Sequence, residues 1–213
     1  MFPTLQLEVL ERFTAIEQHF RTSRRLRGDT SQTAKGLTFV QIYAIHEYTV
    51  KNVVKIAATE IAAHGHAYAR LRPSLLALFL EPEVQSLRDC SPNDRWNRRI
   101  ALLERASSVE SVSFSAAPLP TDGTHFRQTH VQLILRVFGD HKSVTIHQRH
   151  LRYIDTIVNN RNAVAHGGET AAEVGRRYSR QDIWRYIRRM RSLCLRLIQI
   201  VSEYCGLPEK HCR

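Results

Sequence analysis

The sequence predicts an all-α protein, and three observations support that fold class. Apolar residues recur at intervals of three and four along several segments, which is the period of an amphipathic helix. Residues 179–182 form a capping-box pattern directly before the clearest of these segments. The alternation between Val109 and Ser115 is too weak to indicate a sheet. The length of 213 residues fits one domain, or one domain with an insertion.

The first predicted helix covers residues 5–21, where apolar side chains recur at helical spacing. Residues 24–36 contain arginines, glycines and polar residues, so they predict a basic loop. The second predicted helix covers residues 38–63 and ends before Gly65. Glu47 falls on the apolar face of that helix, so we expect its side chain to be buried or half-buried.

The middle of the chain, residues 65–123, has the character of an insertion. Pro73, Pro82 and Pro92 divide it into short helices, and Trp96 to Ala106 is one candidate. The core of the predicted domain therefore consists of residues from about 38–64 and 124–205, preceded by the N-terminal helix.

Three further helices complete the predicted core. One covers residues 125–138 and ends at Gly139, and the next covers residues 147–166 and ends at two glycines. The last begins at Ser179 and continues to Gly206, with apolar residues on one face and arginines on the others.

The chain is strongly basic, with 31 Lys and Arg residues against 20 Asp and Glu and a net charge of +11. This charge favours an anionic partner: RNA, DNA, an acidic protein or a membrane. A guanidinium is planar and stays charged, so it matches phosphate oxygens well. The candidate RNA-binding residues are Arg24, Arg25, Arg27, Arg185 and Arg188.

The cysteines Cys90, Cys194, Cys205 and Cys212 form no CxxC pair and match no familiar zinc spacing, so we expect no metal ligands. The N-terminus lacks the pattern of a signal peptide. The most apolar region, residues 37–63, is interrupted by charged residues and is not expected to cross a membrane. Together these features predict a cytoplasmic protein.

The candidate for chemistry is the run from Asn159 to Gly168, which contains Arg161 and His166 at a helix end. Arginine suits a phosphate, and histidine suits proton transfer near neutral pH. Five helical positions correspond to a rotation of about 140°, so the two side chains do not share one face. The alternative is a histidine placed favourably on the helix dipole and an arginine in a surface ion pair. From the residues alone, both interpretations stay open.

The string Arg161-Asn162-x-x-x-His166 resembles the Arg-polar-xxx-His motif of the HEPN superfamily. Its form, RNAVAHGG, is similar to that of stand-alone prokaryotic HEPN ribonucleases of the RiboL-PSP-HEPN-like kind. The flanking predicted helices occur in the matching order, and the pair Glu47 and Lys51 is similar to an acidic-basic element on an early helix of some relatives. The resemblance covers roughly residues 38–205.

This resemblance implies a four- or five-helix bundle, with an inserted irregular or helical segment, that forms a homodimer around the motif. It also implies metal-independent RNA cleavage without a cofactor, by attack of the 2′-OH on the adjacent phosphate. His166 then acts as general base or acid, and Arg161 holds the phosphate. Asn162, Glu47 and Lys51 are the supporting candidates, although Glu47 and Lys51 also fit a simple surface ion pair.

Two functions follow from this resemblance. The first is an endoribonuclease in toxin–antitoxin or anti-phage defence, with an antitoxin or other protein partner. The second is a catalytically inactive HEPN module that binds nucleic acid, a nucleotide or a protein. HEPN partners of nucleotidyltransferase antitoxins carry a Tyr shortly after the His, where this chain has Gly167 and Gly168. A third hypothesis, a basic DNA-binding protein, lacks a helix-turn-helix pattern.

Overall fold

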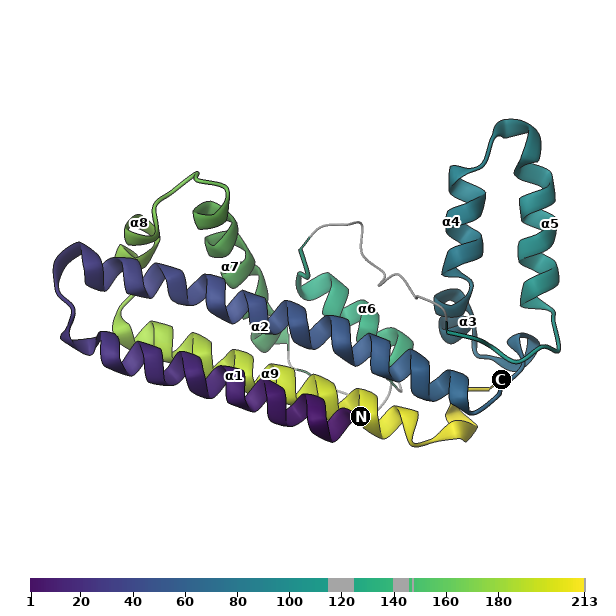
Figure 1. The fold of residues 1–213 in the computed structure, drawn as a ribbon, viewed down its shortest axis with the longest axis horizontal. Coiled ribbons are helices and arrows are strands. Elements are labelled where there is room, and N and C mark those ends of the chain that lie inside the picture. Colours follow the sequence, from purple (N-terminus) through teal and green to yellow (C-terminus); the bar gives the residue numbers. More distant parts are fainter. Residues whose placement is uncertain (115–124, 140–145, 147, 213) are drawn as a thin grey trace. The chain divides into compact units, whose positions relative to one another are not determined.

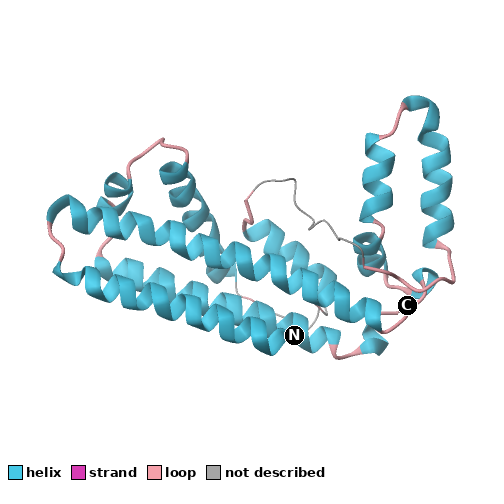
Figure 2. Ribbon diagram, in the orientation of Figure 1, coloured by secondary structure: helices cyan, strands magenta, loops and turns pink. Residues whose placement is uncertain are grey.

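A computed structural model describes residues 1–114, 125–139, 146 and 148–212 of the chain (Figure 1). These residues form helices joined by loops, as Figure 2 shows. The β-type pairing among them is limited to the two isolated bridges Ala67–Ser111 and Leu71–Cys212. The prediction of an all-α protein is therefore confirmed.

The α-helices have the following bounds: α1 Phe2–Thr22, α2 Gly28–Ala63, α3 Pro73–Phe79, α4 Glu81–Asp89, α5 Arg95–Ala106, α6 Gln128–Phe138, α7 Gln148–Ala165, α8 Ala171–Arg176 and α9 Arg180–Cys205. The predicted basic loop over residues 24–36 is wrong, because α2 already begins at Gly28. The short helix α8 has no counterpart among the predicted elements. The other predicted helices are present, with ends that differ by a few residues.

The chain divides into two compact units. The first contains Met1–Val53, Gly123–Gln132 and Thr145–Gln199, and the second contains Val54–Asp122, Leu133–Val144 and Ile200–Arg213. Residues 65–114, the described part of the predicted insertion, lie within the second unit, but helices α2, α6 and α9 contribute residues to both units.

The first unit is built around the apolar stripe of α1. Its members recur every three or four residues and are all buried: Phe2, Leu5, Val9, Phe13, Ile16 and Phe20. Phe20 packs edge-on against Trp184 of α9, with ring centroids 5.4 Å apart. The Arg191 guanidinium of α9 also pairs with the Glu17 carboxylate at 2.8 Å. These contacts hold α1 against α9.

Two glycines allow α2 and α8 to cross with their backbones in contact. A Cβ atom at Gly36 would lie 1.9 Å from the carbonyl oxygen of Ala171, and one at Gly175 would lie 1.9 Å from that of Gln32. No real Cβ atom tolerates such a distance, so only glycine fits at either position. Gly36, which helped to predict a loop, is therefore a packing residue inside a helix.

Local capping determines where α7 ends and where α8 and α9 begin. Gly167 follows α7 with φ of +70°, a left-handed conformation that favours glycine. Thr170 and Glu173 form a reciprocal capping box at α8. At α9 the Ser179 backbone N–H donates to Asp182 and the Ser179 hydroxyl accepts from the Asp182 N–H, at 3.0 and 3.1 Å. The predicted capping box is confirmed.

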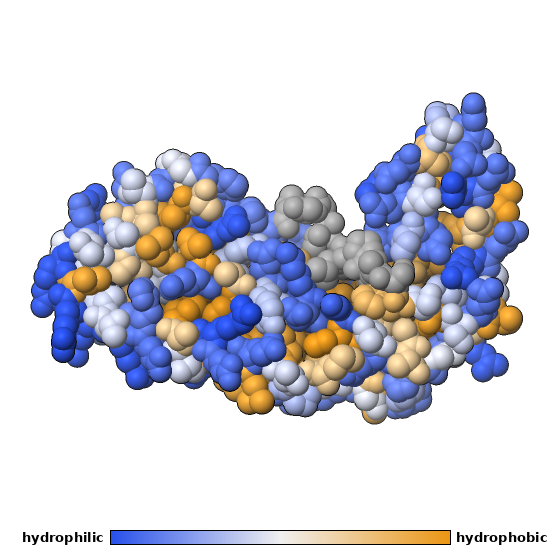
Figure 3. Space-filling model, viewed as in Figure 1, coloured by the Kyte–Doolittle hydropathy of each residue, from blue (hydrophilic) through white to orange (hydrophobic). Residues whose placement is uncertain are grey.

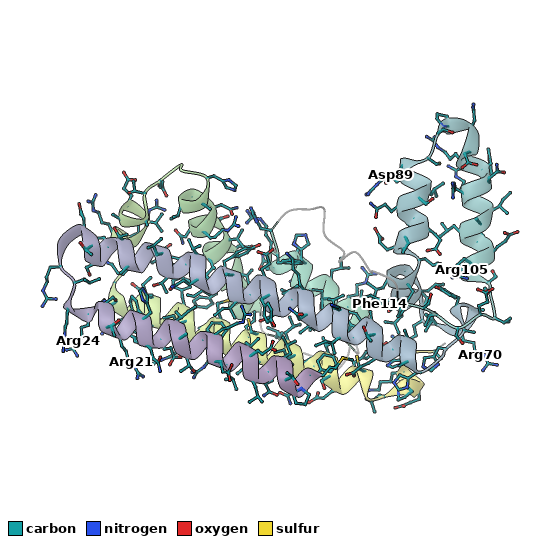
Figure 4. The ribbon with its side chains drawn as sticks, in the orientation of Figure 1. Arg21, Arg24, Arg70, Asp89, Arg105 and Phe114 are labelled. Carbon is teal, nitrogen blue, oxygen red and sulfur yellow. The ribbon has the colours of Figure 1, made fainter. Side chains whose placement is uncertain are left out.

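The second unit combines a buried helix with an exposed hairpin. Helix α3 buries Leu75, Leu76, Leu78 and Phe79, whereas α4 and α5 have no buried residue. Apolar side chains on α5 are open to solvent, namely Trp96, Ile100 and Leu103, and Figure 3 shows orange atoms among the blue ones on this hairpin. Figure 4 labels Arg105 near the base of α5, where its guanidinium lies 4.6 Å above the Tyr68 ring.

Cys194 is buried in the first unit, as its apolar spacing predicts, and all four cysteines are free. Within the described ranges, no helix combines the length and the apolar character needed to cross a bilayer.

Candidate active site

The candidate site includes a short segment before α6, in which two side chains of α2 hydrogen-bond to the backbone N–H and carbonyl of Phe126. Phe126 is buried, and its N–H donates to the Tyr43 hydroxyl at 3.3 Å. The carbonyl oxygen of Phe126 accepts from Nε2 of His46 at 3.1 Å. Tyr43 and His46 are three positions apart and so lie on one face of α2. Because the Phe126 backbone is fixed in this way, the neighbouring residue His125 has a defined place.

Arg161 of α7 reaches this segment. Its side chain is half-buried and passes 4.9 Å from the centre of the Tyr43 ring, a cation–π contact. Nη1 of Arg161 donates to Oδ1 of Asn162 at 3.1 Å and lies 3.5 Å from Nε2 of His125. The guanidinium is therefore held by three neighbours before any ligand binds.

His166 is a second neighbour of the same histidine. Its side chain is exposed at the end of α7, and its backbone N–H still donates to the carbonyl oxygen of Asn162 at 3.0 Å. The rings of His166 and His125 have centroids 6.1 Å apart. Arg161 and His166 are about 140° apart around α7 and do not share a face. His125 nevertheless lies near both of them. We call these three residues the Arg161–His166 cluster.

Helix α7 also presents a polar stripe to the segment before α6. Asp155, Asn159, Asn162 and His166 are three or four positions apart and share one face. Oδ1 of Asp155 accepts the N–H of Gln128 at 3.2 Å, which caps the start of α6. Oδ1 of Asn159 accepts from Arg127 at 3.0 Å. These bonds tie the start of α6 to α7 beside the cluster.

Burial and charge set the ionisation of the site. Burial, followed by the positive charge of Arg161 and the nearby His166, lowers the pKa of His125 below its ordinary value of 6.5. Burial also raises the pKa of Tyr43, and the Glu47 carboxylate adds to that increase. Tyr43 therefore keeps its proton near neutral pH, and His125 is mainly neutral there.

The supporting candidates Glu47 and Lys51 form a salt bridge of 2.6 Å one helical turn apart on α2. Glu47 is half-buried, as expected, and its charge raises the pKa of Tyr43. Lys51 is exposed and contacts Glu47. The pair is both a surface ion pair and a source of negative charge beside Tyr43.

The candidate RNA-binding arginines lie away from the cluster in the sequence and on other elements of the first unit. Arg24, Arg25 and Arg27 follow α1, and Figure 4 shows Arg24 projecting outward where the chain turns into α2. Arg185 and Arg188 lie on α9 and line a groove of about 530 Å³ together with Gln181, Trp184, Arg189 and Ser192. The Arg188 guanidinium lies 5.8 Å from the Trp184 ring.

His125 and Tyr43 are the site residues that sequence reasoning missed. His125 lies just before α6, where no periodicity of the sequence marks it as functional. Tyr43 occupies an apolar position of α2 and looks like an ordinary core residue. An unexplained histidine just before a helix of a basic chain is the one signal that could have indicated the site.

Metal ligands do not converge at the cluster or elsewhere in the described ranges, where no group of three or more His, Cys, Asp or Glu side chains is placed to hold an ion. The cluster itself is composed of one guanidinium and two imidazoles, which suits an anionic ligand.

The fold and the site define a class of helical protein with an arginine–histidine cluster where a helix ends. The sequence matches the family described as MAE_28990-like HEPN over residues 6–209, and the chain belongs to this HEPN family. Neither the curated proteins nor the solved structures contain a match to the chain.

Proposed function

We propose that this HEPN protein is a metal-independent endoribonuclease that cleaves RNA by attack of the ribose 2′-OH on the adjacent phosphate. The observation that carries the proposal is the Arg161–His166 cluster, in which one histidine ring lies against both motif residues. A guanidinium binds phosphate oxygens, and an imidazole transfers protons near neutral pH. Cleavage of a phosphodiester requires both functions.

Each motif residue has a defined role in this proposal. Arg161 binds the phosphate and stabilises the charge that develops on its oxygens as the 2′-oxygen attacks. Asn162 holds the Arg161 guanidinium by accepting a hydrogen bond at 3.1 Å. His166, the exposed member of the cluster, transfers a proton to or from the reacting oxygens. The products are a 2′,3′-cyclic phosphate and a 5′-hydroxyl end.

The test is RNA cleavage by the purified protein in the presence of EDTA. We expect cleavage by the wild type, a loss of about 10²- to 10⁴-fold in His166→Ala, and a loss of about 100-fold or more in Arg161→Lys, because Lys cannot make the bidentate contact. His19→Ala and Arg70→Lys change exposed residues and serve as matched controls with unchanged activity.

Two results would contradict the proposal. RNA that stays intact with the wild type but is still bound would favour the catalytically inactive HEPN module. Cleavage that persists in His166→Ala at the rate of the control would show that the activity does not come from this site.

The basic groove on α9 supports RNA as the substrate. Arg185, Arg188 and Arg189 line it together with Trp184. Basic side chains beside a half-buried aromatic ring match the backbone charge and the stacked bases of single-stranded RNA. We propose that this groove binds the RNA strand, with the arginines of the α1–α2 turn as a second contact surface.

The proposed biological role is toxin–antitoxin or antiviral defence in the cytoplasm, with a homodimer as the active form. Uncontrolled RNA cleavage harms the cell that contains it, so a role of this kind needs a protein partner that restrains it. Expression in a bacterial host tests the role. We expect growth arrest with the wild type and normal growth with His166→Ala at equal protein level; equal growth of both would contradict it.

A further inference from the structure

His125 is placed as rigidly as the motif residues, although it is not part of the motif. Tyr43 and His46 hold both backbone groups of the next residue, Phe126. Nδ1 of His125 lies 3.4 Å from the Tyr43 hydroxyl, and Nε2 lies 3.5 Å from Nη1 of Arg161. Both ring nitrogens therefore have neighbours, and the ring is half-buried between α2 and α7.

The neighbours determine which ring nitrogen carries the proton. Arg161 can only donate, so Nε2 of His125 must present its lone pair to the guanidinium. Nδ1 then carries the hydrogen and donates it to the Tyr43 hydroxyl, which also accepts the Phe126 N–H. This tautomer directs an unprotonated nitrogen toward the cation that is proposed to bind phosphate. Both contacts are long, as is common for catalytic groups without substrate.

The charges around His125 favour its neutral form. Burial has the largest effect on its pKa, followed by the charges of Arg161, His166 and Arg127, and all four lower it. Glu47 acts in the opposite direction and has the smallest effect. A histidine that is neutral near pH 7, with its lone pair toward the guanidinium proposed to bind phosphate, has the properties of a general base.

We propose that His125 is the general base of the cleavage reaction and that His166 is its general acid. This inference rests on the ribonuclease proposed above. Nε2 of His125 takes the proton of the 2′-OH, the bond between the 2′-oxygen and phosphorus forms, and the bond between phosphorus and the 5′-oxygen breaks. His166 gives its proton to the departing 5′-oxygen, so a cyclic phosphate and a 5′-hydroxyl leave.

The spacing of the two rings fits this division of work. The attacking and departing oxygens lie roughly in line on opposite sides of phosphorus. Each ring nitrogen must come within about 2.6–3.2 Å of its own oxygen. Ring centroids 6.1 Å apart are close enough for both imidazoles to reach one phosphate group, with Arg161 beside it.

The first test compares His125→Asn with the wild type and with His19→Asn, an exposed control. Asn keeps an N–H where Nδ1 stood but cannot take a proton, so we expect a loss of about 10²- to 10⁴-fold in kcat/KM. RNA affinity and the melting temperature should match the control. Full activity in His125→Asn, with wild-type cleavage intact, would overturn this inference and leave the ribonuclease proposal standing.

The second test uses a nucleoside 3′-(p-nitrophenyl phosphate), whose leaving group departs without needing a proton. On this substrate His166→Ala should recover most of its lost activity, because the general acid is no longer needed, whereas His125→Asn should not. Recovery by His125→Asn, or by both variants alike, would overturn the assignment of the base.

A pH profile separates a base from a residue that only positions Arg161. In the wild type, kcat/KM should rise with pH through a limb centred below 6.5, as His125 loses its proton. That limb should be missing in His125→Asn. A variant with a lower rate but an unchanged limb would show that His125 positions Arg161 and takes no proton. Absence of any wild-type cleavage would instead overturn the ribonuclease proposal itself.

Discussion

His46 holds the backbone of the candidate site from α2 and shows how strongly burial changes the pKa of a single residue. Its side chain is 1% exposed, and burial lowers its pKa to about 4. Nε2 donates to the Phe126 carbonyl, and Nδ1 is buried without a hydrogen-bond partner among the described residues. The ring is therefore neutral in the folded protein, and its hydrogen bond fixes the segment that carries His125.

This residue predicts a loss of stability in acid. The unfolded chain binds a proton at His46 near pH 6.5, but the folded chain does so only near pH 4. The contribution is thus constant above pH 6.5 and is lost as the pH falls from there toward 4. Two and a half pKa units correspond to about 3 kcal/mol.

Urea unfolding at a series of pH values between 7.5 and 4 measures this loss. Because the Gln side chain does not titrate, His46→Gln should flatten the decline in unfolding free energy, whereas the exposed control His19→Gln should not. An identical decline in His46→Gln and the wild type would contradict the prediction.

At the scale of elements, the crossing of α2 and α8 depends on two glycines. We expect Gly36→Ala or Gly175→Ala to destabilise the first unit by about 1–3 kcal/mol, because each added methyl group would collide with a backbone carbonyl that cannot move alone. Thermal unfolding measures the effect.

Gly206→Ala is the matched control for this pair, since its added Cβ would meet no atom closer than 3.6 Å. Gly167→Ala gives an intermediate case: it has open space around it, and the cost comes only from its φ of +70°, about 1 kcal/mol. Equal melting temperatures for Gly36→Ala and Gly206→Ala would contradict this prediction, because they would show that α8 moves aside without loss of stability.

At the scale of the whole molecule, the basic surface predicts how RNA binding responds to salt. Each arginine that contacts a phosphate of a single strand adds about 0.7 to the slope of log affinity against log salt. We expect Arg188→Gln to weaken RNA binding and to reduce that slope by about this amount. Fluorescence anisotropy over a range of salt concentrations measures both, with Arg70→Gln in the second unit as the control. An unchanged slope would exclude Arg188 from the RNA contacts.

The proposed homodimer is tested by light scattering on the full chain. We expect twice the mass of one chain, because the HEPN resemblance implies a site shared between two copies. A monomer that cleaves RNA would contradict the shared site, and it would show that the cluster of one chain, with His125 beside Arg161 and His166, is sufficient.

The sequence alone determined the features that depend on local interactions. The helical period of α1 and the capping box at Ser179 each depend on residues only a few positions apart, and the structure confirms both. The end of α7 at Gly167 follows from the conformational freedom of glycine. The Arg161–His166 motif can also be read from spacing, but spacing leaves open whether its two side chains meet.

Only the tertiary structure decided how the candidate site is assembled. His125 contacts Tyr43 across 82 positions of the chain and Arg161 across 36, so no local pattern could reveal either contact. The start of α2 at Gly28 is a similar case, because Gly36 was read as a loop signal while its packing against Ala171 is what requires glycine there. Helices form from neighbouring residues, whereas a site forms where distant helices come together.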